Sequence, residues 1–280
     1  MKDEFTLKTE EPLPTPERLA VECSELLAVA FGGGTNSTAM LCGFKEQGIK
    51  PDLILFADTG GEMPGTYEHV EEMRGVVKEW WGMDIETVRA TYQGEFEGLE
   101  KNCLRKKMLP SLAYGRKGCS MKYKVDPQKK RLKTFLTDMG EDNCIKAIGY
   151  DAGESHRLLR GSNDGIERFW YPLVEWQWRR QECMEAIARH GITQPGKSAC
   201  YFCPAMKRGE ILRLKKHHPE LFRRALALEA QSQLKTVGRG LGGSALRWEN
   251  VDTEDEAQGK LWEWLDENDE SPIPCGCYDG

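Results

Sequence analysis

The chain has 280 residues, of which 39% are hydrophobic and 30% charged, a balance that is ordinary for a globular protein with a buried core. Its net charge of −6 excludes a uniformly polycationic protein, so nucleic-acid binding would need a local basic patch. No apolar run approaches the roughly 20 residues that cross a bilayer, and the first residues lack the apolar core of a secretory signal. We therefore expect a cytoplasmic protein without membrane association.

The predicted elements alternate between strand and helix. Residues 26–31 form a short apolar run, which is typical of a strand buried on both faces. A glycine turn follows, and residues 37–47 then carry apolar side chains at helical spacing. The other expected elements are a helix over 67–81 and strands over 53–57, 85–88 and 143–149. This order predicts an α/β, Rossmann-like fold whose mostly parallel sheet has helices on both faces.

The composition changes along the chain and suggests three parts. Residues 1–22 are acidic and contain several prolines, so we expect a flexible lead-in. Residues 23–210 hold the alternating elements and form the predicted nucleotide-binding domain. Residues 211–280 begin with helical patterns and become glycine-rich and acidic, which predicts a helical or irregular C-terminal extension with a cysteine-containing tail.

The polar motifs of the first half follow the predicted strands. Asp58 and Thr59 end the second strand, and residues 149–157 follow a later one. The carboxyl ends of parallel strands meet at one edge of a sheet, where ligands bind. Unpaired N–H groups at a helix N-terminus bind anions, and glycines let a phosphate approach closely. The turn after the first strand therefore predicts a phosphate site, with a plain tight turn as the alternative; its residues are Gly32, Gly33, Gly34, Thr35, Asn36 and Ser37.

Ten cysteines in a cytosolic chain favour metal ligands, buried thiols or catalytic thiols over a disulfide framework. The Cys200-x-x-Cys203 pair places two thiols on one tight turn, which suits zinc or an iron–sulfur cluster. Two buried thiols without a metal are the alternative. Five other cysteines have no partner at ligand spacing: Cys23, Cys42, Cys103, Cys144 and Cys183.

The stretches FGGGTNSTAML and FADTGGEMPGTYEHV resemble the PP-loop superfamily, and within it the phosphoadenosine phosphosulfate reductase-like family. The segments 119–127, 149–157 and 172–176 and the C-x-x-C pair resemble further family motifs, in the family's order. The superfamily loop reads S-G-G-x-D-S, and Gly32 and Asn36 replace its first Ser and its Asp. In the later G-x-R-x-x-E-S-x-R motif, Asp151 replaces the first Arg.

This resemblance implies an adenine nucleotide, either ATP or a sulfonucleotide, with Mg²⁺ as a further candidate. Lys124 and Arg157 would neutralise negative charge on the phosphate or sulfate and are the implied catalytic cations. The residues implied to bind the nucleotide are those of the glycine turn together with Asp58, Thr59, Gly149 and Glu154.

The resemblance also implies a 4Fe–4S cluster on Cys119, Cys200 and Cys203, with zinc as the alternative. The fourth ligand would be Cys277 or Cys275, or one iron would stay open. Cys275 is followed by glycine, as in the tail nucleophile of sulfonucleotide reductases, so it is a candidate catalytic thiol. An inert tail is the third reading.

Together these features predict an enzyme of sulfur chemistry that performs sulfonucleotide reduction or ATP-dependent sulfur transfer. Its partners would be a thiol or sulfur donor and an acceptor. Two basic segments, 105–131 and 207–224, are compatible with a nucleic-acid acceptor, although charge runs also occur on solvated helix faces. An oligomer is compatible with the sequence. The alternative function is a non-catalytic nucleotide-sensing or interaction protein with a structural zinc, for which Asn36 and Asp151 are the sequence support.

Overall fold

The computed structural model describes residues 25–160, 165–233 and 247–251. Its centre is a five-stranded sheet with the strand order β3-β2-β1-β6-β7, and every neighbouring pair is parallel. The predicted α/β, Rossmann-like fold is confirmed. The strands are β1 (Leu27–Ala30), β2 (Leu53–Asp58), β3 (Ile85–Arg89), β6 (Cys144–Ile148) and β7 (Glu167–Trp170).

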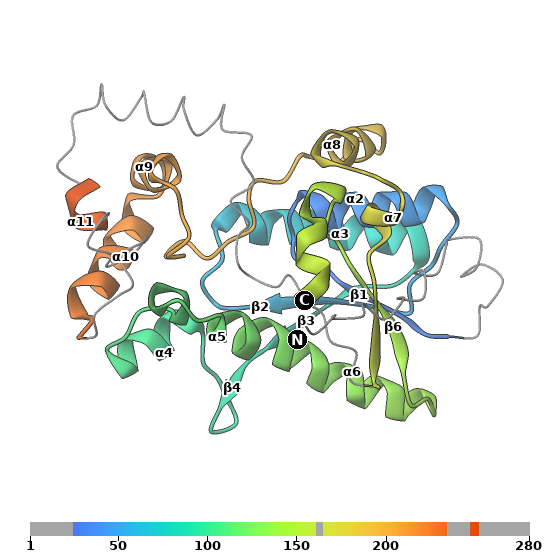
Figure 1. The fold of residues 1–280 in the computed structure, drawn as a ribbon, viewed down its shortest axis with the longest axis horizontal. Helices are drawn as coiled ribbons and strands as arrows, with labels where there is room; N and C mark the ends of the chain where they lie inside the picture. The colour runs from blue at the N-terminus through green and yellow to red at the C-terminus, as the bar shows by residue number, and fades with distance from the viewer. Residues whose placement is uncertain (1–24, 161–164, 234–246, 252–280) are drawn as a thin grey trace, which may run out of the picture.

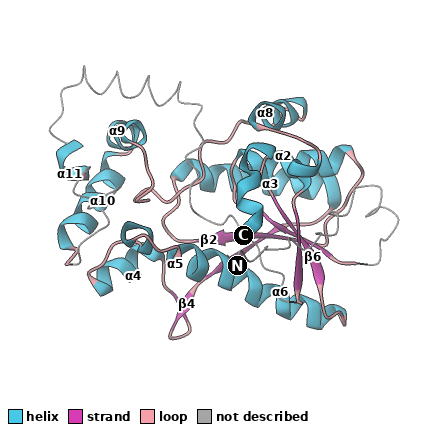
Figure 2. Ribbon diagram, in the orientation of Figure 1, coloured by secondary structure: helices cyan, strands magenta, loops and turns pink. Residues whose placement is uncertain are grey.

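Helices cover both faces of this sheet (Figure 1 and Figure 2). Successive strand residues point to opposite faces, so Val29 packs with one apolar cluster and Ala28 with another. The first cluster includes α2 (Thr35–Glu46), α3 (Pro64–Trp81) and α8 (Arg180–Arg189). The second includes α6 (Asp126–Met139), which lies on the other side of the sheet. Both faces of these strands are buried, as suits β1, which is apolar throughout, and β2, which is apolar up to its last residue, Asp58.

The central strand β1 sets the position of the site. It pairs with β2 on one side, where Val29 lies opposite Ile54, and with β6 on the other, where Val29 lies opposite Ala147. The strands that follow β1 in sequence, β2 and β3, therefore lie on one side of it, and the later strands β6 and β7 lie on the other. In such sheets the crevice at the carboxyl ends of the two diverging strands is where ligands bind. Here those strands are β1 and β6.

A third apolar cluster lies beside the sheet and joins segments that are far apart in sequence. It combines α4 (Leu99–Lys106) with the C-x-x-C turn and with α9 (Arg208–His217), α10 (Pro219–Gln231) and α11 (Trp248–Val251). The described part of the predicted C-terminal extension is therefore helical and packs directly against the cysteine-bearing segments. The domain boundaries themselves stay a prediction.

The remaining elements are short. The strands β4 (Thr91–Tyr92) and β5 (Glu95–Phe96) form an antiparallel hairpin between β3 and α4. The short helical segments are η1 (Ser111–Tyr114), α5 (Gly118–Ser120), the π-helical turn η2 (Met121–Val125), η3 (Ala152–Arg160) and α7 (Pro172–Glu175). Among the described helices, none combines the length and apolar character needed to cross a membrane.

Candidate functional site

The glycine turn lies at the carboxyl end of β1 and leads into α2, as the sequence predicts. The Ser37 hydroxyl stabilises the conformation of this turn. Its Oγ accepts hydrogen bonds from the N–H groups of Gly32 at 3.2 Å and Gly34 at 3.3 Å. The same hydroxyl donates to the Gly34 carbonyl at 3.1 Å. The first N–H groups of α2 have no partner within the helix, and the helix dipole adds a partial positive charge there. The turn is thus shaped to hold an anion.

Three other segments pack closely against this turn, and glycines occupy the points of contact. Gly33 has a left-handed φ of +70°, and a Cβ there would lie 3.1 Å from the methyl groups of Thr66 and Val70 on α3. A Cβ on Gly34 would lie 3.3 Å from Ser198, and one on Gly149 would lie 3.0 Å from the backbone of Ser37. The glycines therefore allow close packing of the turn against α3, residue 198 and the β6 loop.

A buried histidine supports the same turn from α3. The Thr38 hydroxyl donates to the Gly34 carbonyl at 2.9 Å and also lies 2.8 Å from His69 Nε2. The other ring nitrogen of His69, Nδ1, lies 3.5 Å from Glu72, so α3 holds the imidazole between the turn and this carboxylate. Burial lowers the pKa of His69, and nearby Glu72 only partly opposes that shift. His69 could not be identified from the sequence, because its role depends on how α3 packs on the turn.

Two of the three positions that depart from the motifs that the sequence resembles, Asn36 and Asp151, touch each other. The Asn36 side-chain amide donates to Asp151 at 3.0 Å and to Glu154 at 2.9 Å. A carboxylate at position 36 would face these two acids directly, whereas an amide satisfies both. Glu154 also pairs with Arg157, whose guanidinium carbon lies 4.0 Å from the ring centre of Tyr150. Glu154 therefore lies at the glycine turn and holds Arg157 on its other side; their predicted roles in nucleotide binding and catalysis stay predictions.

The end of β2 is held by a separate set of hydrogen bonds. Asp58 is buried and accepts from Gly60 N–H at 2.7 Å, the Tyr67 hydroxyl at 2.8 Å and Arg89 Nε at 2.8 Å. These bonds fix the loop after β2. Thr59, the next residue, donates to Glu62 at 2.9 Å, and its hydroxyl lies 3.2 Å from Cys200 Sγ. Thr59 thus connects the β2 loop to the cysteines.

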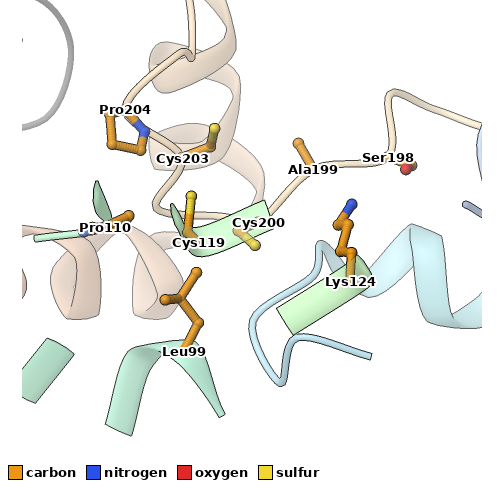
Figure 3. A pocket seen from close by; sticks show the side chains of 9 residues that line it. All are labelled: Leu99, Pro110, Cys119, Lys124, Ser198, Ala199, Cys200, Cys203 and Pro204. Carbon is orange, nitrogen blue, oxygen red and sulfur yellow. The ribbon is translucent and has the colours of Figure 1, made fainter. Parts of the chain in front are cut away.

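The three predicted metal ligands in the described chain line one cavity of about 20 Å³, together with Lys124 (Figure 3). Cys200 and Cys203 lie on a tight turn in which Cys203 N–H donates to the Cys200 carbonyl at 3.0 Å. Cys119 comes from α5. Lys124 is nearly buried on the π-helical turn, and its Nζ lies 3.8 Å from Glu62. Figure 3 shows the Lys124 side chain rising toward the loop that carries Ser198 and Ala199.

Backbone pairing attaches the cysteine turn to the β2 loop. Met63 N–H donates to the Ala199 carbonyl at 3.0 Å, and Tyr201 N–H donates to the Gly61 carbonyl at 2.9 Å. A Cβ on Gly61 would lie 2.5 Å from the Phe202 ring, so this approach requires glycine. Glu62, which the sequence analysis did not single out, is 4% exposed at the centre of this pairing. The cysteines and the sheet edge therefore form one rigid unit.

The donor set suits a metal centre, although the described side chains do not form one as they stand. Within residues 25–160, 165–233 and 247–251, no three His, Cys, Asp or Glu side chains are arranged to ligate an ion. Cys200 lines the cavity, and its sulfur also lies 3.2 Å from the Thr59 hydroxyl. Three thiols on one cavity still match zinc or iron–sulfur chemistry. The predicted Cys275 and Cys277 lie outside the described residues.

Cys103, which has no partner at ligand spacing in the sequence, lies near Cys119 in the structure. Cys103 of α4 shares with Cys119 the wall of a second cavity of about 180 Å³, which Lys106 and Lys122 also line. Burial, with Cys119 as a smaller contributor, raises the pKa of Cys103 to about 12. Cys103 is therefore a protonated thiol at neutral pH. Spacing along the chain could not reveal this proximity, because it arises from the packing of α4 on α5.

Comparison with known proteins gives limited matches. No family model matches the chain. An uncharacterized protein of Methanocaldococcus jannaschii is 27% identical over 241 residues, covering 79% of this chain and 45% of that protein. The chain thus spans less than half the length of this curated relative. Among solved structures, the U34-tRNA thiolase NcsA from Methanococcus maripaludis, with its 4Fe-4S cluster, has 13% identity and a TM-score of 0.43; the match covers 86% of this chain and 84% of that one.

The Asn36–Asp151 contact can be tested with a double-mutant cycle. Asn36→Asp should lower the free energy of unfolding by about 2 kcal/mol, since it replaces hydrogen bonds to charged groups with like-charge repulsion. Adding Asp151→Asn should recover part of this loss and give a coupling energy above about 0.5 kcal/mol. Urea denaturation at neutral pH measures all four proteins. Strictly additive effects would show that the contact does not exist in solution.

The buried His69 predicts a pH dependence. Its folded-state pKa is lowered, so protons bind the unfolded state more readily below the ordinary histidine pKa of about 6.5. The free energy of unfolding should therefore fall as the pH drops below that value, by at most about 1.4 kcal/mol per pH unit. Urea titrations between pH 7.5 and 5.5 should show a shallower slope for His69→Gln than for the wild type. The exposed His217, changed to Gln, serves as the control; equal slopes for all three proteins would contradict the assignment.

Proposed function

We propose that this protein binds an adenine nucleotide on the glycine turn and uses it in sulfur chemistry at the adjacent cysteines. The favoured reaction is ATP-dependent sulfur transfer to an acceptor. The observation that carries the proposal is the path of residues 198–203. Ser198 packs on Gly34 of the turn, and Cys200 follows only two residues later, within about 7 Å of extended chain. An anion on the turn and a thiol of the cavity are therefore close neighbours.

In the proposed reaction the phosphates lie over residues 32–37. An acceptor oxygen attacks the α-phosphorus, the bond to the β-phosphate oxygen breaks, and pyrophosphate leaves. A sulfur nucleophile then attacks the activated carbon, and the carbon–oxygen bond breaks to release AMP. Lys124, which contacts Glu62 and lines the cysteine cavity, would neutralise charge on the departing phosphate. Arg157, held by Glu154 near the turn, is the second cation.

Cys119, Cys200 and Cys203 would hold the metal centre. A 4Fe–4S cluster bound by three thiolates leaves one iron that can carry the sulfur to be transferred. The protein's own contribution is to keep these thiols on a fixed turn beside the nucleotide and to bury Glu62 and Lys124 next to them. Burial strengthens the electrostatic effect of both groups on a reacting phosphate.

Sulfonucleotide reduction uses the same geometry, with the sulfur carried by the nucleotide itself. In that reaction the Cys275 thiolate would attack the sulfur of the bound nucleotide, the sulfur–oxygen bond would break, and the nucleotide phosphate would leave. The thiol donor would then attack the resulting S-sulfocysteine and release sulfite with formation of a disulfide. Mg²⁺ would accompany ATP rather than a sulfonucleotide. The non-catalytic alternative, nucleotide sensing with a structural zinc, predicts binding without turnover.

Protein purified without oxygen should contain about four iron and four acid-labile sulfide per chain on the cluster hypothesis. Cys200→Ala and Cys203→Ala should each remove most of this iron, whereas the buried core thiol Cys183, changed to Ala, should keep it. A colourless protein with one tightly held zinc would exclude the cluster and favour the sensing alternative.

Nucleotide use is measured separately, by pyrophosphate release and by consumption of adenylyl sulfate. Gly149→Ala should weaken ATP binding at least tenfold, because its Cβ would displace the backbone at Ser37. Gly65→Ala on α3 is the matched control, since a Cβ there meets nothing within 4 Å. Equal ATP affinity in the two variants would show that the glycine turn does not bind the nucleotide.

A further inference from the structure

The hairpin of β4 and β5 exposes two aromatic rings beside the site. It extends away from the sheet, and Gln93 and Gly94 turn the chain with φ values of 53° and 86° (Figure 1). Tyr92 is 43% exposed and Phe96 is 41% exposed. The pairing register places Tyr92 opposite Glu95 and Phe96 opposite Thr91, so the two rings lie on opposite faces of the hairpin. Neither ring belongs to a described apolar cluster, so core packing does not account for them.

An arginine side chain packs over each ring in a cation–π contact. The guanidinium carbon of Arg89 lies 5.0 Å from the centre of Phe96, and that of Arg105 lies 4.3 Å from the centre of Tyr92. Carboxylates fix both arginines, since Arg89 donates to Asp58 and Arg105 to Glu97. Such contacts hold the rings in place at low entropic cost while leaving ring surface in solvent. The hairpin thus presents two positioned aromatic surfaces.

Phe96 lies next to the candidate reaction centre. A Cβ on Gly60 would lie 2.8 Å from the edge of the Phe96 ring. Gly60 follows Thr59, whose hydroxyl lies 3.2 Å from Cys200 Sγ. Only Gly60 and Thr59 therefore separate the Phe96 ring from Cys200. A planar group stacked on Phe96 would lie next to the β2 loop that contacts this thiol.

The surrounding segment is strongly basic. Residues 89–124 contain nine lysines and arginines against three glutamates, whereas the whole chain has a net charge of −6. Two of these glutamates are already paired, Glu97 with Arg105 and Glu100 with Arg224. Besides Arg89, which lies over Phe96, exposed cations follow the hairpin on and after α4: Lys101, Arg105, Lys106 and Lys107. Phosphates are the complementary partner for such a surface.

We propose that the β4–β5 hairpin is a base-stacking element for a single-stranded nucleic acid, with Phe96 stacking the base nearest the thiols and the α4 cations holding the phosphates. Exposed aromatic rings interleaved with lysine and arginine are the combination that binds single strands. A protein partner fits less well, because the cores of protein interfaces are depleted in lysine. The inference deepens the proposed function by identifying the sulfur acceptor, and it rests on that function only for this identification.

Fluorescence anisotropy with labelled 20-nucleotide single strands, RNA and DNA of one mixed sequence, tests the proposal on the intact protein. At least one strand should bind more tightly than the corresponding duplex. Phe96→Ala and Tyr92→Ala should each weaken binding about tenfold and leave the salt dependence unchanged. The control is Met139→Ala, which removes an equally exposed apolar side chain from α6. Lys106→Gln should instead lower the slope of log K against log salt by about one.

Absence of single-strand binding, or binding that both aromatic variants retain at full strength, would overturn the proposal. Preference for RNA or for DNA identifies the source of the strand. Because binding needs neither the metal nor ATP turnover, the two ideas fail separately. Hairpin-dependent binding in a protein without turnover would leave the hairpin inference standing and refute the proposed enzyme. Turnover with a small acceptor, without strand binding, would support the proposed enzyme and refute the hairpin inference.

Discussion

The backbone pairing between the β2 loop and the cysteine turn is the contact on which the rest of the site depends. Two hydrogen bonds, at residues 61–63 and 199–201, attach the C-x-x-C turn to the carboxyl edge of the sheet. Without them, Cys200 and Cys203 would belong only to the helical cluster of α4, α9 and α10. With them, a thiol lies beside Thr59, and Ser198 reaches the glycine turn. Two motifs about 165 residues apart in sequence thereby become one site.

The departures from the superfamily motifs take on a different meaning in three dimensions. On sequence alone, Asn36 looks like the loss of a negative charge and Asp151 like an independent reversal of a positive one, and both support a non-catalytic reading. In the structure they are hydrogen-bonded partners, and Glu154 completes the arrangement. An amide facing two carboxylates keeps the turn and the β6 loop together. The charged and polar side chains beside the turn still pair with one another, although their identities differ from those of the motifs. This arrangement is compatible with a phosphate site.

The parallel sheet and its ligand-bearing edge could be predicted because β1 and most of β2 and β6 are apolar, and polar motifs follow these strands. Strand β7 was missed, since Glu-Arg-Phe-Trp carries two charged residues in four; the buried Glu167 is paired with Lys146 of the neighbouring strand β6. The β4–β5 hairpin was missed because its paired strands are only two residues long. Cys103, Glu62 and His69 owe their roles to packing between distant segments, which one sequence does not display.

The central claim is that the nucleotide and the thiols share one site. Alkylation of metal-free protein by iodoacetamide, followed at individual cysteines by mass spectrometry with and without saturating ATP, tests it most directly. The account predicts that bound ATP slows the alkylation of Cys200 severalfold and changes Cys103 little, because Cys103 faces the other cavity. Equal rates at Cys200 with and without ATP, in protein whose nucleotide binding is verified independently, would contradict it.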